Sequence, residues 1–153
     1  MLPGSFSDAS VTDLSLAVTA LRVMVVDDNV DAANSLAWAV EALGDEVETC
    51  HDGRKAVAAA YAFLPHVILL DLNMPEMDGL QVCTLLRSDP RLMGVKIIAQ
   101  TGRAEPEARQ LTAAAGFDLH LVKPVDLDLL ADVLELLRSE RARLRPVRDQ
   151  GAE

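Results

Sequence analysis

Five apolar runs alternate with five helix-like segments along the chain, and this alternation constrains the fold more than any other feature. The apolar runs predict strands at residues 21–27, 46–51, 66–71, 95–100 and 118–122. The segments between them predict helices at about 30–43, 53–63, 79–87, 105–115 and from about 126 onward. Strands and helices that alternate in this way form a parallel sheet covered on both faces by right-handed crossovers. The sequence therefore predicts an α/β fold with a doubly wound, five-stranded parallel sheet and five helices.

The chain has room for one domain. It contains 153 residues, and half of them are apolar. Residues 1–20 mix Ser, Thr, Asp and Gly with a few apolar residues, which predicts a flexible N-terminal arm. The folded domain is expected at 21–138, followed at 139–153 by a charged helix extension and tail in which Pro146 should end the last helix. No output domain is expected in a tail of this length.

Net charge and hydropathy narrow the class of partner. The net charge of −10 argues against binding to nucleic acid, because the phosphate backbone would repel most of the surface. No apolar stretch approaches the ~20 residues of a membrane span, and no basic segment followed by an apolar run marks the N-terminus. Two cysteines without metal-ligand spacing fit reduced core residues. We therefore expect a cytoplasmic protein that contacts neither membrane nor nucleic acid.

Charged and polar residues stand where the predicted strands end. Asp27 and Asp28 follow the first strand, Asp71 the third, Thr101 the fourth and Lys123 the fifth. In a doubly wound sheet these carboxyl ends lie side by side, so the five side chains should meet in one crevice. Crowded carboxylates raise one another's pKa unless a cation joins them, and Mg²⁺ prefers carboxylate, carbonyl and phosphate oxygens. The sequence predicts a magnesium site at this edge.

A carboxylate beside such a metal site can also act as a nucleophile. It can take up a phosphoryl group as an aspartyl phosphate. Phosphoryl transfer depends mostly on positioning and charge neutralisation, so a metal, an ammonium and a hydroxyl donor around the carboxylate suffice. Asp71 follows a strand that should be central in the sheet, and it is the natural acceptor.

The motifs at these strand ends identify a family. The segments "VMVVDDN", "ILLDLNMPEMDGL", "IIAQTG" and "HLVKPVD" occur in this order, and together they closely resemble the receiver domains of two-component response regulators. The resemblance covers about residues 21–138. It implies the flavodoxin-like strand order 2-1-3-4-5, as in the chemotaxis members of the family.

The resemblance also implies roles for single residues. Asp71 would accept the phosphoryl group from a phosphohistidine on a histidine kinase or a phosphotransfer protein. Asp28 would bind Mg²⁺ directly, Asp27 mainly through water, and the backbone carbonyl of Asn73 would be a further ligand. The domain would catalyse only its own phosphorylation and dephosphorylation.

Further roles concern the response to phosphorylation. Lys123 would pair with the phosphoryl oxygens, its peptide bond to Pro124 would be cis, and Thr101 would move inward to hydrogen-bond the phosphoryl group. The family places Tyr or Phe three residues before this lysine, where this chain has His120. Imidazole is smaller and can titrate, so a switching role and a structural role for His120 both stay open.

The only tryptophan suggests a contact surface. Ala32, Leu36, Ala39, Val40 and Leu43 recur at spacings of three and four and should face the sheet, which places Trp38 on the outer face of the first helix. Phosphodonor helical bundles dock on this helix in receivers, as the resemblance implies. We expect a helical partner, or a second copy of the chain in a homodimer, to contact a surface formed by five residues: Val30, Ala33, Asn34, Ala37 and Trp38.

Two other function classes compete with the phosphoacceptor. A haloacid-dehalogenase-like phosphatase would want a second acid two residues after its nucleophile, where this chain has Asn73. A receiver-shaped interaction module that is never phosphorylated usually lacks one of the acids, the threonine or the lysine, and all are present here. A stand-alone regulator, a phosphorelay shuttle and a receiver from a hybrid histidine kinase stay open, with a downstream protein as the target.

Overall fold

The computed structural model describes residues 20–102 and 106–144. The expected N-terminal arm, apart from Ala20, and the expected helix stop at Pro146 lie outside these ranges. Leu21–Leu127 form one compact unit, whereas the helix residues from Asp128 onward belong to a second, described here by itself. None of the helices in the described ranges combines the length and apolarity that crossing a membrane requires.

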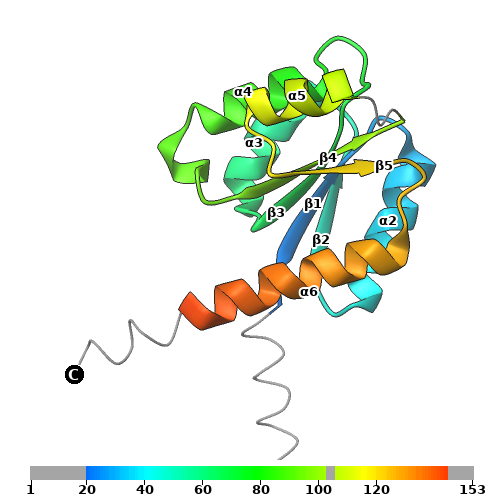
Figure 1. The fold of residues 1–153 in the computed structure, drawn as a ribbon, viewed down its shortest axis with the longest axis vertical. Helices are drawn as coiled ribbons and strands as arrows, with labels where there is room; N and C mark the ends of the chain where they lie inside the picture. The colour runs from blue at the N-terminus through cyan, green and yellow to red at the C-terminus, as the bar shows by residue number, and fades with distance from the viewer. Residues whose placement is uncertain (1–19, 103–105, 145–153) are drawn as a thin grey trace, which may run out of the picture. The chain divides into compact units, whose positions relative to one another are not determined.

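The expected alternation of strands and helices is confirmed (Figure 1). The strands are β1 (Arg22–Val26), β2 (Glu46–Cys50), β3 (Val67–Asp71), β4 (Lys96–Thr101) and β5 (Leu119–Val122). The helices are α2 (Val30–Ala42), α3 (Gly53–Phe63), α4 (Gly79–Arg87), α5 (Pro106–Ala115) and α6 (Leu127–Leu144). A short 3-10 helix, η1 (Pro90–Leu92), which the periodicity did not predict, lies between α4 and β4.

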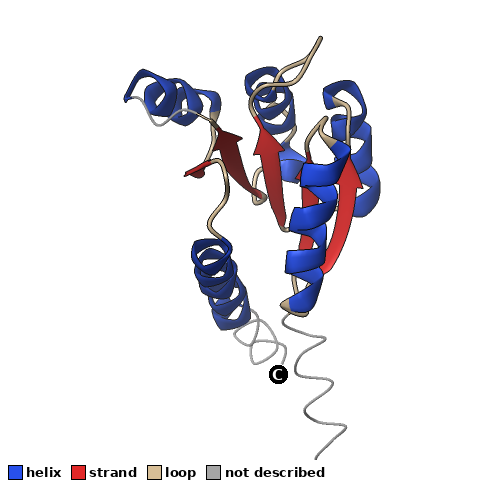
Figure 2. Ribbon diagram, turned by 90° about the vertical axis from the view of Figure 1, so that its right-hand side faces the viewer, coloured by secondary structure: helices blue, strands red, loops and turns tan. Residues whose placement is uncertain are grey.

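All strand pairs are parallel, and the strand order β2-β1-β3-β4-β5 is the one that the resemblance implies. The arrowheads in Figure 2 accordingly point the same way. β3 lies at the centre, and all five of its residues are buried. Its carboxyl end, Asp71, is therefore flanked by the ends of β1 and β4.

Alternate strand residues face the two sides of the sheet. On one side Met24, Ile68 and Ile97 form a core with apolar residues of α3, α4 and η1. Figure 1 shows α3, α4 and α5 gathered together. Right-handed crossovers place α2 on the other side, where it contacts β1 and β2.

The buried stripe of α2 differs from the expected one. Ala33, Leu36, Ala37 and Val40 are buried, at the i, i+3, i+4, i+7 spacing of a helix face. The expectation that Leu43 faces the sheet is wrong, because this residue caps the helix and is 41% exposed. The expectation that Ala33 and Ala37 lie on the partner surface is also wrong, because both belong to the buried stripe.

The α6 helix carries alternating charge. Asp128 lies in its first turn, Arg141 and Arg143 in its last, and this order favours the helix macrodipole. Arg138 donates to Glu135 at 2.6 Å one turn away, and Leu130 and Leu134 are buried. The expected charged extension is thus helical through Leu144.

Candidate functional site

Three carboxylates meet at the carboxyl edge of the sheet. Asp27 and Asp28 follow β1, and Asp71 is the last residue of β3. One carboxylate oxygen from each lies within 4.8 Å of the other two, which is close enough for one cation to bridge them. Asp27 and Asp71 are buried, whereas Asp28 is exposed. The cluster is therefore open to solvent on the side of Asp28.

Lys123 joins this cluster from the loop after β5. Its Nζ lies 3.1 Å from Asp27 Oδ2 and 3.4 Å from Asp71 Oδ2. The peptide bond between Lys123 and Pro124 is cis, as the resemblance implies. With all groups ionised, three carboxylates and one ammonium leave two negative charges, which a divalent cation would neutralise.

Burial and charge change the proton affinities of this site. Burial raises the pKa of Asp71 to about 6, and the negative charge of Asp27 adds to this effect. The hydrogen bond from the Asn73 N–H and the charge of Lys123 act in the opposite direction. Burial lowers the pKa of Lys123, but its hydrogen bond to Asp27 and the charge of Asp71 outweigh burial, so this pKa is raised. Lys123 is held as a cation.

The loop after β3 is fixed close to Asp71. The Asn73 N–H donates to Asp71 Oδ1 at 3.1 Å, and the Leu72 N–H donates to the carbonyl of Gln100 at 3.0 Å. Asp78 caps α4 with a capping box that includes Gln81. Gly79 allows the helix to start here, because a Cβ at this position would overlap the carbonyl oxygen of Asp71.

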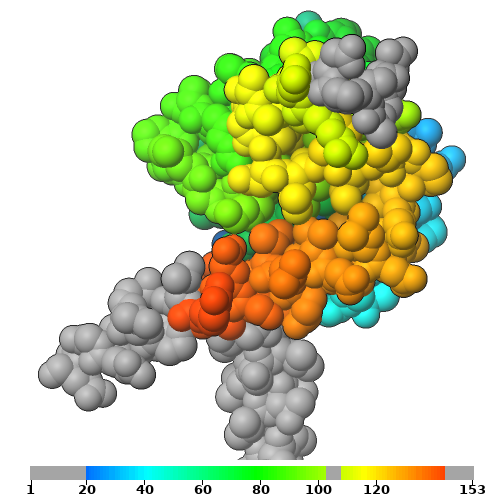
Figure 3. Space-filling model, in the orientation of Figure 1, coloured from blue at the N-terminus to red at the C-terminus, as the bar shows by residue number. Residues whose placement is uncertain are grey.

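The predicted switch residues lie on β4 and β5. Thr101 is buried at the carboxyl end of β4, and its carbonyl accepts from the Lys123 N–H at 2.7 Å. His120 is partly buried on β5, and its Nδ1 lies 3.4 Å from the hydroxyl of Thr112 on α5. α5 and β5, both yellow, adjoin on the surface shown in Figure 3.

Sequence reasoning missed two features at this site. It did not predict that Lys123 pairs with Asp27 as well as Asp71, since this depends on side-chain conformations that spacing does not specify. It also passed over Gln100, which is 1% exposed in β4 although its side chain is polar. A glutamine directly after the apolar residues Ile97, Ile98 and Ala99 was the available signal.

The fit of a divalent cation can be judged from these groups. Carboxylates are the hard oxygen ligands that Mg²⁺ prefers, and burial, together with a smaller effect of the charge of Asp27, raises the pKa of Asp71. A cation among Asp27, Asp28 and Asp71 would favour the ionised form of these carboxylates. The donor set therefore fits Mg²⁺.

A parallel sheet in the order 2-1-3-4-5 with an acidic cluster and a lysine at its carboxyl edge defines a receiver-type phosphoacceptor fold. The profile of the response regulator receiver domain matches residues 23–135. The chain belongs to this family, whose members serve in two-component signalling and typically bind Mg²⁺ at an acidic site. Receiver domains interact with histidine kinases and downstream targets, and response regulators are not classical enzymes.

Curated relatives include regulators and a kinase. The transcriptional regulatory protein PrrA of Mycobacterium tuberculosis is 40% identical over 122 residues, which cover 79% of this chain and 52% of PrrA. The histidine-protein kinase BarA of Escherichia coli is 32% identical over 115 residues, 75% of this chain and 12% of BarA. This chain thus spans about half the length of PrrA and a small part of BarA.

Solved receiver structures share the fold. The chemotaxis protein CheY4 of Vibrio cholerae has a TM-score of 0.73 and 31% identity, over 77% of this chain and 98% of its own. The receiver domain of the sensor histidine kinase PA1611 from Pseudomonas aeruginosa has a TM-score of 0.72 and 27% identity, over 78% and 98%. That structure holds a magnesium ion in its active-site cleft.

Proposed function

We propose that the chain is a receiver that accepts a phosphoryl group on Asp71 from a phosphohistidine of a histidine kinase or phosphotransfer protein. One observation carries the proposal: the Asp71 carboxylate lies within 4.8 Å of the Asp27 and Asp28 carboxylates and 3.4 Å from the ammonium of Lys123. A buried carboxylate with these partners is placed for nucleophilic attack rather than for packing. The proposed receiver spans residues 21–138, and we place its function in the cytoplasm.

Asp28 and Asp71 would hold Mg²⁺ through their carboxylates, Asn73 through its backbone carbonyl and Asp27 through water. When bound, the cation neutralises the phosphoryl oxygens and so lowers the barrier to transfer. The three carboxylates support this assignment, and the magnesium in the PA1611 receiver cleft adds to it.

The proposed transfer needs little further machinery. A carboxylate oxygen of Asp71 attacks phosphorus, the phosphorus–nitrogen bond of the phosphohistidine breaks, and its electron pair returns to the imidazole. Lys123 gives up part of its contact with Asp71 and pairs instead with the phosphoryl oxygens. Hydrolysis ends the signal: water attacks phosphorus, the phosphorus–oxygen bond to Asp71 breaks, and phosphate leaves. The chain would thus catalyse only its own phosphorylation and hydrolysis.

The response would reach partners through α5 and β5. Thr101, at the end of β4, would move toward the phosphoryl group, and His120 would change its contact with Thr112. Leu111 on α5 and Leu119 on β5 are 58% and 43% exposed, which gives this face apolar area for protein contact. We propose that the downstream target is a protein that binds to this face.

The chain has two candidate places in a signalling system, which differ in the protein that donates the phosphoryl group. Similarity to PrrA favours a response regulator, whereas similarity to BarA and to the PA1611 receiver favours a receiver of a hybrid kinase or a phosphorelay shuttle. Phosphotransfer profiling would separate them. Fastest transfer from a sensor kinase indicates a regulator, and fastest transfer from a free phosphotransfer protein indicates a relay.

Acetyl phosphate labelling tests the acceptor. With Mg²⁺, the wild-type chain should gain one phosphoryl group by intact-mass measurement, because a small donor needs no docking surface. Asp71→Asn and excess EDTA should each abolish the gain. Asp132→Asn, which changes an exposed aspartate of α6, is the matched control and should label like wild type. A full mass shift in Asp71→Asn would rule out Asp71 as the acceptor.

Beryllofluoride titration with Mg²⁺ tests the response, because this anion mimics the phosphoryl group. Backbone NMR should show shifts at Thr101, at His120 and along α5, as well as at the acidic cluster. Lys123→Ala should retain Mg²⁺ binding but lose the distant shifts, because the link between the phosphoryl group and β5 is removed. Shifts confined to the acidic cluster in the wild type would instead favour an interaction module that phosphorylation does not control.

A further inference from the structure

A histidine holds the peptide that joins the two adjacent acids of the cluster. His51 follows the last residue of β2, and its Nδ1 lies 3.0 Å from the backbone carbonyl oxygen of Asp27. A carbonyl oxygen can only accept a hydrogen bond, so Nδ1 carries a hydrogen and is the donor. This oxygen belongs to the same planar peptide as the N–H of Asp28. His51 therefore contacts the link between two residues of the proposed magnesium site.

The hydrogen bond from His51 continues the ladder between β1 and β2 beyond the ends of both strands. The last pair in the ladder is Val26 with Cys50, and the Asp27 N–H then donates to the Cys50 carbonyl at 2.9 Å. One step further along, the donor is the side chain of His51 instead of a backbone N–H. The histidine thus fixes the backbone of Asp27 at the point where the chain leaves the sheet.

The other contacts of Asp27 involve its side chain and do not act on the peptide that leads to Asp28. Oδ1 accepts from the Asn29 N–H at 2.9 Å, and Oδ2 lies 3.1 Å from Lys123 Nζ. Asp27 is fully buried, whereas Asp28 is exposed, so packing does not fix the Asp28 carboxylate. Its position relative to Asp71 depends on the orientation of the Asp27–Asp28 peptide.

Loss of the His51 donor would leave the buried carbonyl of Asp27 without this partner. An unsatisfied buried carbonyl costs free energy, so the peptide would turn toward water or another donor. Turning the peptide moves the Asp28 carboxylate relative to Asp71. Metal sites are sensitive to such changes, because removing a group that orients a metal ligand typically weakens metal binding about 10–100-fold.

We infer that His51 is a positioning residue for Mg²⁺, which holds the Asp27–Asp28 peptide so that the carboxylates of both residues face Asp71. It acts through the backbone and is not itself a ligand. The inference rests on the proposed phosphoacceptor function, because the cation that it concerns is the one that serves Asp71.

Two substitutions separate the donor from the bulk of the ring. His51→Asn places a side-chain nitrogen as many bonds from the backbone as Nδ1, so it can still donate to the carbonyl. His51→Leu has a similar branched shape and no donor. The dissociation constant for Mg²⁺, measured by NMR titration of the full chain at pH 7.5, should rise about tenfold in His51→Leu. In His51→Asn it should stay within about threefold of the wild-type value.

His66→Leu is the matched control at the opposite edge of the sheet. His66 directly precedes β3, and its Nδ1 accepts from the Arg22 N–H of β1 at 2.9 Å. This variant also loses a hydrogen bond between a histidine ring and the backbone of β1. Its free energy of unfolding should fall, whereas its dissociation constant for Mg²⁺ should equal that of the wild type.

Acetyl phosphate labelling gives a second readout. Because His51 positions the cation and takes no part in the transfer itself, His51→Leu should label more slowly than the wild type at low Mg²⁺. Once Mg²⁺ saturates the site, the variant should label at nearly the wild-type rate. A rate that stays low at saturating Mg²⁺ would contradict a role limited to the cation.

Three further outcomes would overturn the inference and leave the proposed function intact. They are an unchanged Mg²⁺ affinity in His51→Leu, an equal loss in His51→Leu and His51→Asn, and an equal loss in His66→Leu. A wild-type chain that binds no Mg²⁺ would instead contradict the proposed function, and the inference with it.

The wild-type ring decides the matter if His51→Leu fails to fold. NMR at pH 7.5 should show a hydrogen on Nδ1 of His51, and the Nδ1 resonance should shift as Mg²⁺ binds. An Nδ1 without a hydrogen, or a resonance that Mg²⁺ leaves unchanged, would overturn the inference.

Discussion

Among the residues of the candidate site, Asp71 has a pKa that depends strongly on burial. Without a cation its pKa is raised from 3.8 to about 6, chiefly because the side chain is buried. In the unfolded chain the carboxyl has its ordinary pKa, so between these two pH values the folded state binds more protons. Stability therefore falls as pH rises through this window. The contribution is fully present below about pH 4 and lost above about pH 6.

Asp71→Asn should stabilise the cation-free protein at pH 7.5. The amide removes the buried negative charge, and the free energy of unfolding should rise by about 1–3 kcal/mol, an order-of-magnitude value from the pKa difference. Urea unfolding in EDTA at pH 4.5 to 7.5 checks this. The difference in the free energy of unfolding between Asp71→Asn and the wild type should become smaller toward pH 4.5. Asp132→Asn should leave stability within about 0.5 kcal/mol of wild type.

Magnesium should reduce the difference in the free energy of unfolding between Asp71→Asn and the wild type. Because a bound cation favours the ionised carboxylate, Mg²⁺ at pH 7.5 should stabilise the wild type more than Asp71→Asn. Equal stability of the two proteins at pH 7.5 in EDTA would contradict the raised pKa.

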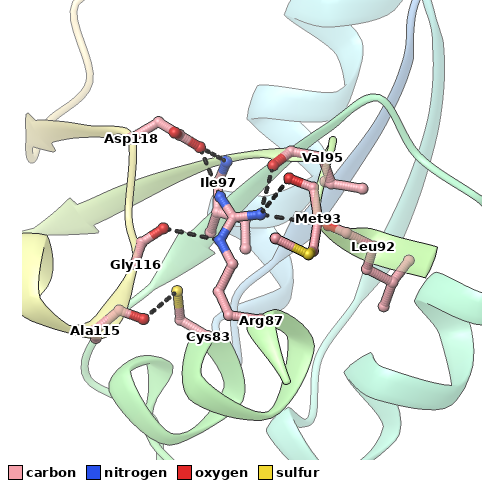
Figure 4. Close-up of polar contacts among 9 residues, drawn as sticks. All are labelled: Cys83, Arg87, Leu92, Met93, Val95, Ile97, Ala115, Gly116 and Asp118. Carbon is pink, nitrogen blue, oxygen red and sulfur yellow. Dashed lines mark hydrogen bonds and ion pairs between the residues drawn. The ribbon is translucent and has the colours of Figure 1, made fainter. Parts of the chain in front are cut away.

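At the scale of elements, one arginine connects several loops by hydrogen bonds at the amino edge of the sheet. Arg87, the last residue of α4, donates to the carbonyls of Leu92, Met93, Val95 and Gly116 and to the carboxylate of Asp118 (Figure 4). The Asp118 oxygen, 2.7 Å from Arg87, also accepts from the Ile97 N–H at 2.9 Å. The arginine thus joins α4, η1, the start of β4 and the start of β5.

Arg87→Met should lower the free energy of unfolding by about 2–4 kcal/mol, because it leaves partly buried carbonyls and a carboxylate without their donor. Arg91→Met is the matched control. The Arg91 side chain is 73% exposed and pairs with Asp89, so its loss should leave the free energy of unfolding close to that of the wild type. Urea unfolding of the three proteins measures both values, and equal losses would show that the Arg87 contacts add no stability.

The elements were predictable because each strand is an apolar run that ends at charged or turn-forming residues. The phase of α2 was not, because alanines at positions 32, 33, 37 and 39 make two adjacent stripes almost equally apolar. Only packing selects the stripe through Ala33 and Ala37. The acidic cluster was predictable because strand ends meet at one edge, whereas the contacts of Arg87 depend on loop conformations that the sequence pattern does not specify.

At the scale of the whole molecule, Trp38 is the largest apolar side chain offered to partners by the first compact unit. It is 69% exposed, and Val30 and Asn34 precede it at spacings of four, so the three lie along one ridge of α2. Ala33 and Ala37 form the neighbouring, buried ridge. We propose that this exposed ridge alone contacts a helical phosphodonor or a second copy of the chain.

Trp38→Ala should slow transfer from the cognate phosphohistidine protein, or weaken homodimer formation, about tenfold or more, because buried tryptophans dominate many interfaces. Labelling of Asp71 by acetyl phosphate should stay unchanged. Met93→Ala removes another exposed apolar side chain, 67% exposed, away from this ridge and should leave transfer unchanged. Unaltered transfer and association in Trp38→Ala would remove the ridge from both interfaces, and quencher-resistant tryptophan emission from the monomer would contradict its exposure.

The Arg87 contacts have a mechanical consequence for β4. The strand is anchored at its amino end through the Ile97 N–H and the Val95 carbonyl, whereas Thr101 lies at its other end. A six-residue strand is about 20 Å long at roughly 3.3 Å per residue. β4 is also paired along its length with β3 and β5, so the strand as a whole is held in the sheet. Any displacement on phosphorylation would therefore be greatest at Thr101, at the end of the strand that lies farthest from the Arg87 contacts.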